Sequence, residues 1–451
     1  MTEQLTEILH IIDDSLWAYI ALPGIILLGF YLSLKSNFVQ IRKLPHIIGT
    51  FIKLTKVRTN KNDQSVHPLK AFFACVGGCI GIGNIVAICT AVQIGGPGAL
   101  FWIWMTAIAG SILKYSEVYL GIRHRTARKD GGYNGGPMYF LKKIFKRSSI
   151  PNLAAFLLCI YGIEIYQFGI VATTIHRSFD IDKIYVVGAL LTLVMAASLG
   201  GVRLVGHISS MLVPFFIVCY LGMGGWVLLQ NLDQLPELFT VIVSSAFTGH
   251  AAVGAFAGSS ILLGVSQGLR RGCYSGDIGI GYASIIHSES CEVIPERQAS
   301  LAIFDIFIDT FMICTTSVLL VLLTGVWKEP IDASTLIQTA LGLHFPYMEF
   351  FMPLFLFLLG YTTVIAYFCA GVKCAQYLNE KYGKIIYYIF AALLFGCFSF
   401  VDTTHALMMM SITGASLLCI NLYGIYHLRH EISFCIYEED KKLEVICDDQ
   451  V

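Results

Sequence analysis

Residues Gly77–Asn84 read GGCIGIGN, which places four glycines inside an otherwise apolar stretch from 70 to 93. A transmembrane helix needs about 20 mostly apolar residues to cross the hydrocarbon core, and this stretch is long enough. Each glycine costs about 1 kcal/mol relative to alanine in a helix interior. Glycine also lets the backbone leave helical geometry and approach a ligand closely. The segment therefore predicts a membrane-spanning helix that is interrupted near its middle.

A second glycine cluster lies in the later half of the chain. Residues 254–260 read GAFAGSS, and Gly264 and Gly268 follow. Close packing of helices through small residues is one explanation for such a cluster. The other is a second interrupted helix, because glycine-broken segments at corresponding positions of two halves point to a transporter binding site. We favour an interrupted helix, since the clusters fall in the second and seventh of the spans counted below.

The composition indicates an all-α polytopic membrane protein. The 451 residues are 56% hydrophobic and 13% charged, with a mean hydropathy of +0.70, whereas soluble domains carry about 25% charged residues. The formal net charge of zero argues against an electrostatic nucleic-acid binder. Every span must be helical, because lipid offers no partner to backbone polar groups. The chain contains about eleven apolar spans, at 15–34, 70–93, 98–121, 151–174, 183–199, 207–230, 241–267, 299–326, 347–372, 384–400 and 403–427.

Basic residues are concentrated in alternate loops. Most lysines and arginines follow the first, third, fifth, seventh, ninth and last spans. The positive-inside rule makes these loops cytoplasmic, so the N-terminus is expected outside and the C-terminus inside a bacterial cytoplasmic membrane. The acidic start, with Asp13 and Asp14, lacks the basic region of a signal peptide.

The whole chain is interpreted as a single transporter domain. If the first span is an extra helix, the remaining ten form two halves of five. The expected parts are the extra helix at 15–34, a first repeat at 70–230, a second repeat at 241–427 and a cytoplasmic tail at 428–451.

Polar residues at membrane depth are functional candidates, because burying them costs free energy. Gln167 lies in the middle of the fourth span, where it can donate to a substrate carboxylate or bond a neighbouring helix. Lys114 and Glu117 lie three residues apart on one helix face, which predicts a structural ion pair. Asp305 and Asp309, four apart on the eighth span, suit either cation coupling or hydrogen bonds between helices.

Catalytic and cofactor-binding patterns are not found in the sequence. The 14 cysteines show no CxxC pair and no Cys/His spacing typical of zinc. No Ser/His/Asp arrangement or HExxH motif is present. We therefore expect no enzyme activity, no catalytic residue and no cofactor, apart from a possible coupling ion.

Motifs along nearly the whole chain resemble the alanine/glycine:cation symporter family, also described as sodium:alanine symporters. The most specific match joins Gly81–Ile85 to Gly95–Trp102. The other matching segments are Phe38–Lys43, Glu117–Val118, Gly135–Tyr139, Pro214–Phe215, Ala255–Ser259 and Asp309–Thr310.

This resemblance implies a leucine-transporter-type fold, with one extra helix before a five-plus-five inverted repeat that contains two discontinuous helices. It also implies sodium-coupled uptake of alanine, glycine or a similar small neutral amino acid. The implied substrate-binding residues are Gly81, Gly83, Asn84, Gln167, Phe256, Gly258 and Tyr361. The implied sodium site comprises Asn84 and backbone carbonyls near Gly77 and Ile80.

Two departures from the family pattern leave alternatives open. Tyr274–Gly279 replaces the family's Phe-Ser-Asn-Glu-Ala-Gly run, and Leu356 and Phe357 stand where the family carries a hydroxyl pair in the ninth span. Hydroxyl oxygens suit a hard cation. A proton-coupled or uncoupled amino-acid transporter without a sodium site is therefore one alternative. A membrane receptor that binds an amino acid without transporting it is another.

Overall fold

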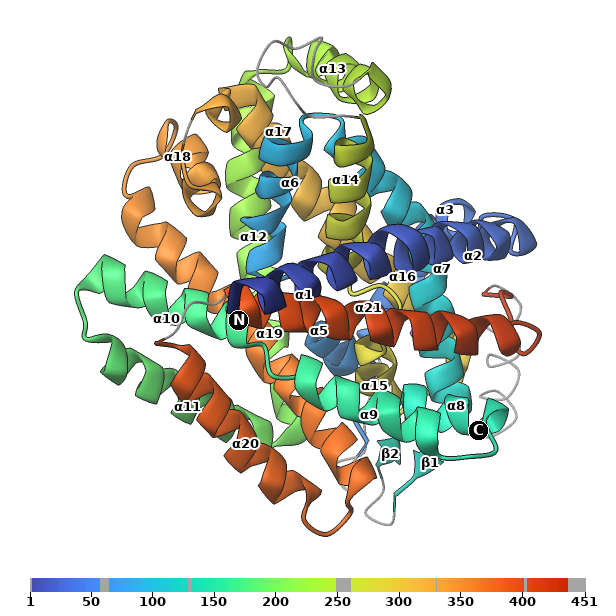
Figure 1. Cartoon of the computed structure of the whole chain (residues 1–451). Coiled ribbons are helices and arrows are strands. Elements are labelled where there is room, and N and C mark those ends of the chain that lie inside the picture. Colours follow the sequence, from blue (N-terminus) through green and yellow to red (C-terminus); the bar gives the residue numbers. More distant parts are fainter. Residues whose placement is uncertain are drawn as a thin grey trace.

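The structure is a computed structural model that describes residues 2–56, 65–128, 132–248, 261–329, 331–400 and 404–436. These residues fold into a bundle of helices (Figure 1). The described strands are β1 (Thr126–Ala127) and β2 (Tyr133–Asn134), which pair antiparallel with Thr126 opposite Asn134. The fold is therefore all-α, as the composition predicts.

Helices account for most of the described residues. The first part of the chain forms α1 (Thr2–Leu16), η1 (Trp17–Ala21), α2 (Leu22–Lys35), α3 (Val39–Arg42), α4 (Leu44–Leu54), α5 (Pro68–Cys79), η2 (Ile82–Asn84), α6 (Ala87–Gly95), α7 (Ala99–Arg123), α8 (Pro137–Ile144), α9 (Ser149–Tyr161), α10 (Ile165–Phe179), α11 (Lys183–Leu199) and α12 (Gly201–Gln230). The later part forms α13 (Leu235–Thr248), α14 (Ile261–Ser275), α15 (Tyr282–Ser288), α16 (Pro295–Ile306), η4 (Phe307–Cys314), α17 (Thr315–Thr324), η5 (Val326–Lys328), η6 (Ala333–Thr335), α18 (Leu336–Gly342), α19 (Met348–Leu378), α20 (Gly383–Phe398) and α21 (Thr404–His427).

Several of these helices can cross a membrane by length and composition. Six of the described helical stretches do so, and the bent pair α5–α6 would make a seventh. Two further expected spans, 183–199 and 384–400, correspond to the shorter apolar helices α11 and α20. The eleven spans expected from the sequence therefore stay a prediction.

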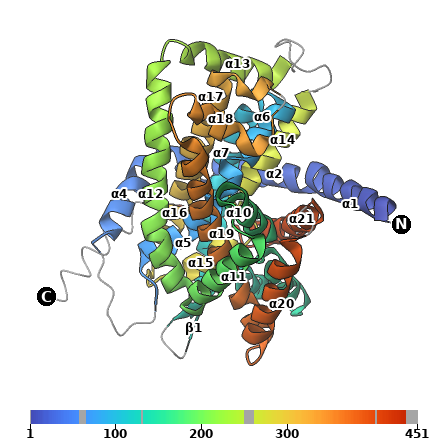
Figure 2. The ribbon, with the colours of Figure 1, turned by 90° about the vertical axis from the view of Figure 1, so that its left-hand side faces the viewer.

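The core and the lipid-facing helices differ in their side chains. In α7, which packs against α14 and α16, nearly every residue from Ala99 to Ile122 is buried. Figure 2 shows α12 running along one side of the molecule. This helix exposes Met211, Phe215, Val218 and Trp226. Large exposed apolar surfaces of this kind mark contact with lipid or partners, and a bilayer accounts for them here.

The first interruption lies where the sequence predicts it. The chain bends by 58° between α5 and the segment from Ile82 to Gly95. Its glycines are required by close contacts: a Cβ added to Gly78 would lie 2.2 Å from the Tyr282 hydroxyl, and one added to Gly81 would lie 2.6 Å from Gln167 Oε1. Glycine at these positions lets side chains from other helices reach the backbone of the bend.

The second interruption lies later in the chain than the glycine count indicates. Helix α14 ends at Ser275 and α15 begins at Tyr282. Between them, Gly279 and Gly281 have φ values of +72° and +108°, in the left-handed region that favours glycine. Thus the break falls at 276–281, which overlaps the end of the segment 274–279 that departs from the family motif. The expected break at 254–260 lies outside the described residues.

Gly264 and Gly268, which we assigned to the second interruption, instead lie inside the regular helix α14. A Cβ on Gly264 would lie 2.9 Å from the Gly95 carbonyl oxygen, and a Cβ on Gly268 would lie 2.6 Å from the Ala99 carbonyl oxygen. These glycines therefore let α14 pack closely on α6 and α7. For these two positions the helix-packing explanation is correct, and the prediction of a break there is wrong.

Candidate functional site

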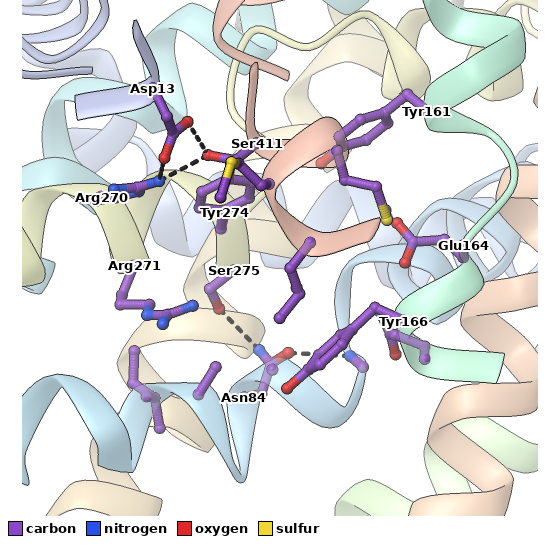
Figure 3. Close-up of a pocket in the computed structure, with 18 of the residues that line it drawn as sticks. Asp13, Asn84, Tyr161, Glu164, Tyr166, Arg270, Arg271, Tyr274, Ser275 and Ser411 are labelled. Atoms are coloured by element: carbon purple, nitrogen blue, oxygen red, sulfur yellow. Dashed lines mark hydrogen bonds and ion pairs between the residues drawn. The ribbon is translucent and has the colours of Figure 1, made fainter. Parts of the chain in front are cut away.

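A cavity of about 390 Å³ lies beside the first interruption (Figure 3). Its walls come from the bend itself and from α1, α10, α14, α19 and α21. The lining residues are His10, Asp13, Asp14, Gly78, Cys79, Gly81, Gly83, Asn84, Ala87, Ile88, Ile94, Tyr161, Glu164, Tyr166, Gln167, Gln267, Arg270, Arg271, Tyr274, Ser275, Tyr367, Leu407, Met408, Met410 and Ser411. The cavity is large enough for a small organic ligand and has polar groups on all sides.

Side chains satisfy the backbone groups that the bend leaves without helical partners. Asn84 Oδ1 accepts from the Gly81 amide at 2.9 Å, and Gln167 Oε1 accepts from the Ile82 amide at 3.1 Å. The Thr363 hydroxyl donates to the Gly77 carbonyl at 3.1 Å. Because buried backbone polar groups need partners, these three side chains stabilise the interrupted geometry.

Next to the bend, three helices bring oxygen atoms together around Asp309. Its carboxylate accepts from the Ser275 and Thr310 hydroxyls, each at 2.9 Å, and from the Asn84 side-chain amide. Ser275 and Asn84 also bond each other at 2.9 Å. Asp309 is fully buried and lies in the π-helical turn η4, a type of distortion that is frequent at functional sites.

The chemistry of this cluster suits a hard cation. Carboxylate, hydroxyl and amide oxygens are the ligands that such cations prefer. Asn84, a residue of the predicted sodium site, donates to the Asp309 carboxylate through its amide nitrogen, and Ser275 and Thr310 donate to the same carboxylate. Gly77 and Ile80, the other predicted sodium ligands, do not line the cavity. They lie within one helical turn of the bend, and the Gly77 carbonyl accepts from Thr363.

The predicted substrate-binding residues fall into three groups. Gly81, Gly83, Asn84 and Gln167 all line the cavity. Tyr361 does not; its ring stacks on Phe357 and its hydroxyl donates to the Leu193 carbonyl at 3.3 Å. Phe256 and Gly258 lie outside the described residues. In this conformation the site is therefore built around the bend without Tyr361.

The ninth span does supply a hydroxyl at the bend. We expected Leu356 and Phe357 to replace a hydroxyl pair, but in α19 Thr363 is the residue that reaches the Gly77 carbonyl. Leu356 is buried, and Phe357 packs against Tyr361, which lies two helical positions before Thr363. Thr363 thus places one hydroxyl at the bend, while the effect of Leu356 and Phe357 on the cation site stays a prediction.

Sequence reasoning missed several residues of the cavity, above all Glu164 and Arg271. Glu164 precedes α10 and is only 5% exposed, and Arg271 lies one turn before Ser275 in α14. Figure 3 shows them on opposite sides of the pocket. Glu164 lies three residues before Gln167 in the same expected span. A charged residue so close to a polar mid-span residue could have predicted that Glu164 also faces the site.

A second buried cluster lies behind the bend. Lys114 Nζ is 2.6 Å from Asp305 Oδ2, 2.8 Å from the Gly276 carbonyl oxygen and 3.1 Å from Cys79 Sγ. Cys75 Sγ also contacts Asp305 at 3.5 Å, and all these side chains are buried. The predicted Lys114–Glu117 ion pair is therefore wrong.

Glu117 has a different partner. It accepts from the Ser284 amide at 3.1 Å, at the start of α15. Lys114 points instead toward α16 because burial of its charge demands a close carboxylate. The two residues thus tie α7 to α16 and to the start of α15, both of which follow the second interruption.

At the mouth of the cavity, the N-terminal helix contacts α14 and α21. Arg270 forms ion pairs with Asp13 and with Asp14, the latter at 3.2 Å, and donates to Ser411 at 2.7 Å. Ser411 also accepts from Trp17 Nε1 at 3.0 Å. Figure 3 shows Asp13, Arg270 and Ser411 gathered at one side of the pocket. The extra helix therefore forms part of the site.

Charged side chains hold the end of α15 and the residues that follow it. Arg125 donates to the carbonyls of Ser288, Ser290 and Glu292, at 3.2, 2.7 and 2.8 Å. Glu289 in the same segment pairs with Arg128 at 3.3 Å and with Lys373. These contacts bind the end of α15 to α7, to the turn after it and to α19.

The sequence and the fold were compared with known proteins. The profile of the sodium:alanine symporter family matches residues 2–444. An uncharacterised transporter of Haemophilus influenzae is 30% identical over 94% of each chain. The sodium/alanine symporter AgcS of Methanococcus maripaludis is 29% identical over 85% of this chain and 86% of its own. The probable sodium/glutamine symporter GlnT of Bacillus subtilis is 27% identical over 88% of this chain and 83% of its own.

Among solved structures, the fold resembles the crystal structure of MhsT in complex with L-phenylalanine. The TM-score is 0.58 at 13% identity, and the match covers 82% of this chain and 90% of MhsT. MhsT has the leucine-transporter-type fold, so this likeness shows the fold that the order of spans and the interrupted helices predict.

Proposed function

Because the chain belongs to the sodium:alanine symporter family, we propose that it carries a small neutral amino acid into the cell together with sodium. The observation that carries the proposal is the cavity at the α5–α6 bend, with the Asn84–Ser275–Asp309 cluster directly beside it. A substrate and a cation can then bind within one site and move together.

The proposed sodium site uses Asp309, Ser275, Thr310 and Asn84. Asp309 supplies the negative charge that offsets the desolvation of a cation, and Ser275 and Thr310 supply neutral hydroxyl oxygens. Asn84 holds the carboxylate in place through its amide nitrogen. Thr363 and the Gly77 carbonyl offer a second place for a cation at the same bend. The similarity to the sodium/alanine symporter AgcS and to the probable sodium/glutamine symporter GlnT also supports sodium coupling.

The proposed amino-acid site is the cavity around Gly81, Gly83, Asn84 and Gln167. Glycines at the bend allow a ligand to approach the backbone, and the polar walls can bind both charged groups of a zwitterion. Alanine and glycine are the first substrates to test, and glutamine is the next because GlnT is among the relatives.

The proposed cycle is alternating access across the cytoplasmic membrane. If the N-terminus lies outside, the cavity mouth lined by α1, α14 and α21 faces outward. The opposite side, where Arg125 holds the end of α15, then faces the cytoplasm. The inward movement would break the contacts that Arg125 makes with the chain after α15. The relatives and the family are transporters, which is why we propose flux and not signalling.

The test is uptake of labelled alanine, glycine and glutamine into proteoliposomes with an inward sodium gradient, a proton gradient or neither. We expect uptake of at least one of them only with sodium. Asp309→Asn should abolish the sodium dependence by removing the charge, whereas Asp233→Asn, at an exposed carboxylate between α12 and α13, should preserve it. Binding without flux would contradict transport, and equal uptake in all gradients would contradict sodium coupling.

A further inference from the structure

An arginine and a glutamate, Arg271 and Glu164, face the cavity without pairing with each other. In the described part of the chain, the Arg271 guanidinium has no hydrogen bond or ion pair, and its Nε is buried without a partner. The Glu164 carboxylate is 5% exposed and lies beside the Gln167 side chain. Figure 3 shows the guanidinium of Arg271 directed toward the middle of the pocket from the side opposite Glu164.

The other strongly basic groups near the site are already neutralised. Arg270, the neighbour of Arg271, is paired with Asp13 and Asp14, and Lys114 is paired with Asp305. Burying a charge without a partner is costly. An arginine and a glutamate left apart on facing walls are therefore best explained by a ligand that brings the complementary charges.

Rival donors at the bend are already engaged. The amides of Gly81 and Ile82 donate to Asn84 and Gln167. Arg271 offers five N–H donors in a planar fork, whose geometry matches a carboxylate. A carboxylate in this cavity thus finds its strongest available partner in Arg271, and an ammonium group finds its partner in Glu164.

We propose that Arg271 and Glu164 recognise the two ends of a zwitterion, Arg271 the carboxylate and Glu164 the ammonium group. This inference rests on the proposed function and specifies how its substrate is selected. It also explains the rejection of ions: Arg271 repels a cation and Glu164 repels an anion, while a zwitterion satisfies both. Specificity of this kind uses repulsion as well as attraction.

The test measures binding of three small ligands to the purified full chain in lipid nanodiscs with saturating sodium. Alanine is the zwitterion, alaninamide lacks the carboxylate and lactate lacks the amine. The unaltered protein should bind alanine most tightly. Arg271→Gln should weaken alanine about ten-fold to a hundred-fold, the effect of losing one charged hydrogen bond, and leave alaninamide unchanged or tighter.

The complementary variant has the opposite signature. Glu164→Gln should weaken alanine by a similar factor and leave lactate unchanged or tighter. Arg177→Gln, which removes an exposed charge on α10, is the matched control and should change none of the three affinities. Arg271→Lys keeps the positive charge and should retain part of the preference for alanine over alaninamide.

The outcomes separate this inference from the proposed function. If the two variants weaken all three ligands equally, or none of them, the assignment of charges is wrong while transport stands. If the unaltered protein binds none of the three and transports no amino acid, the proposed function itself fails. Thermal unfolding of each variant identifies any that does not fold, and Arg271→Lys then carries the test for the arginine.

Discussion

Thr363 tests the second proposed cation position, which lies between α19 and the bend. Its hydroxyl donates to the Gly77 carbonyl at the bend. Thr363→Val keeps the shape and removes the hydroxyl. We expect the sodium concentration for half-maximal uptake to rise about ten-fold, the effect of losing one ligand or hydrogen bond to a charged group.

Thr363→Ser is the matched control, because it keeps the oxygen, and its sodium dependence should stay close to that of the unaltered protein. Identical sodium curves for the valine and serine variants would exclude Thr363 from the ion site. A lower maximal rate with an unchanged sodium curve would assign it a structural role at the bend.

At the residue scale, local signals were sufficient for some of the site. Asn84 and Gln167 stand out because each is a polar residue within an apolar, membrane-length stretch, and both line the cavity. Arg271 was not predicted as a site residue, because it follows the expected span 241–267 and a basic residue at that place is typical of a loop. The partner of Lys114 lies 191 positions away, and no local spacing rule can identify it.

At the scale of elements, the turn between α14 and α15 depends on two left-handed glycines. Gly281 has φ +108°, and a Cβ there would lie 2.5 Å from Pro137 Cγ. We expect Gly281→Ala to destabilise the protein by about 1–2 kcal/mol from the left-handed conformation alone, and more from the contact. The readout is the midpoint of thermal unfolding in detergent.

Gly188→Ala is the matched control for this prediction. Gly188 lies inside α11, where a Cβ would meet nothing within 4 Å. Alanine there should stabilise the helix by up to about 1 kcal/mol. Equal unfolding midpoints for the two variants would show that the α14–α15 turn tolerates a side chain.

The two interruptions differ in how visible they are in the sequence. The first coincides with the densest glycine run, because side chains from four helices, α10, α12, α15 and α19, approach its backbone closely. The second coincides with fewer glycines, and what distinguishes it is the left-handed backbone of Gly279 and Gly281. In the glycine cluster predicted to hold the second break, Gly264 and Gly268 serve helix packing instead, so glycine density alone does not identify a break at these two positions.

At the scale of the whole molecule, the distribution of charge predicts the orientation. Alkaline phosphatase is active only outside the cytoplasmic membrane and a fluorescent protein fluoresces only inside it. Fused after Asn231, between α12 and α13, phosphatase should be active and the fluorescent protein dark. Fused at the C-terminus, the pattern should reverse, because basic residues hold that side in the cytoplasm. Equal signals at both positions would contradict the orientation.

The number of spans is harder to predict than the fold class. Hydropathy identifies α-helical membrane structure at once, because charged residues are half as frequent as in soluble domains. Helices such as α11 and α20 are shorter than a full span, and α7 carries polar residues that pack inward. Their position in the bilayer depends on the helices that pack against them. Counting apolar stretches along the sequence gives no information about this packing.

Cys75 gives the buried cluster behind the bend a further consequence. Its thiol lies on the half of the broken helix that precedes the bend, is fully buried and contacts Asp305 of α16. A thiol reagent can reach it only when α5 separates from the helices packed around it, and the proposed alternating access would involve such a movement. The rate of alkylation at Cys75 therefore reports how often α5 separates from its neighbours, and the native cysteine serves as the probe.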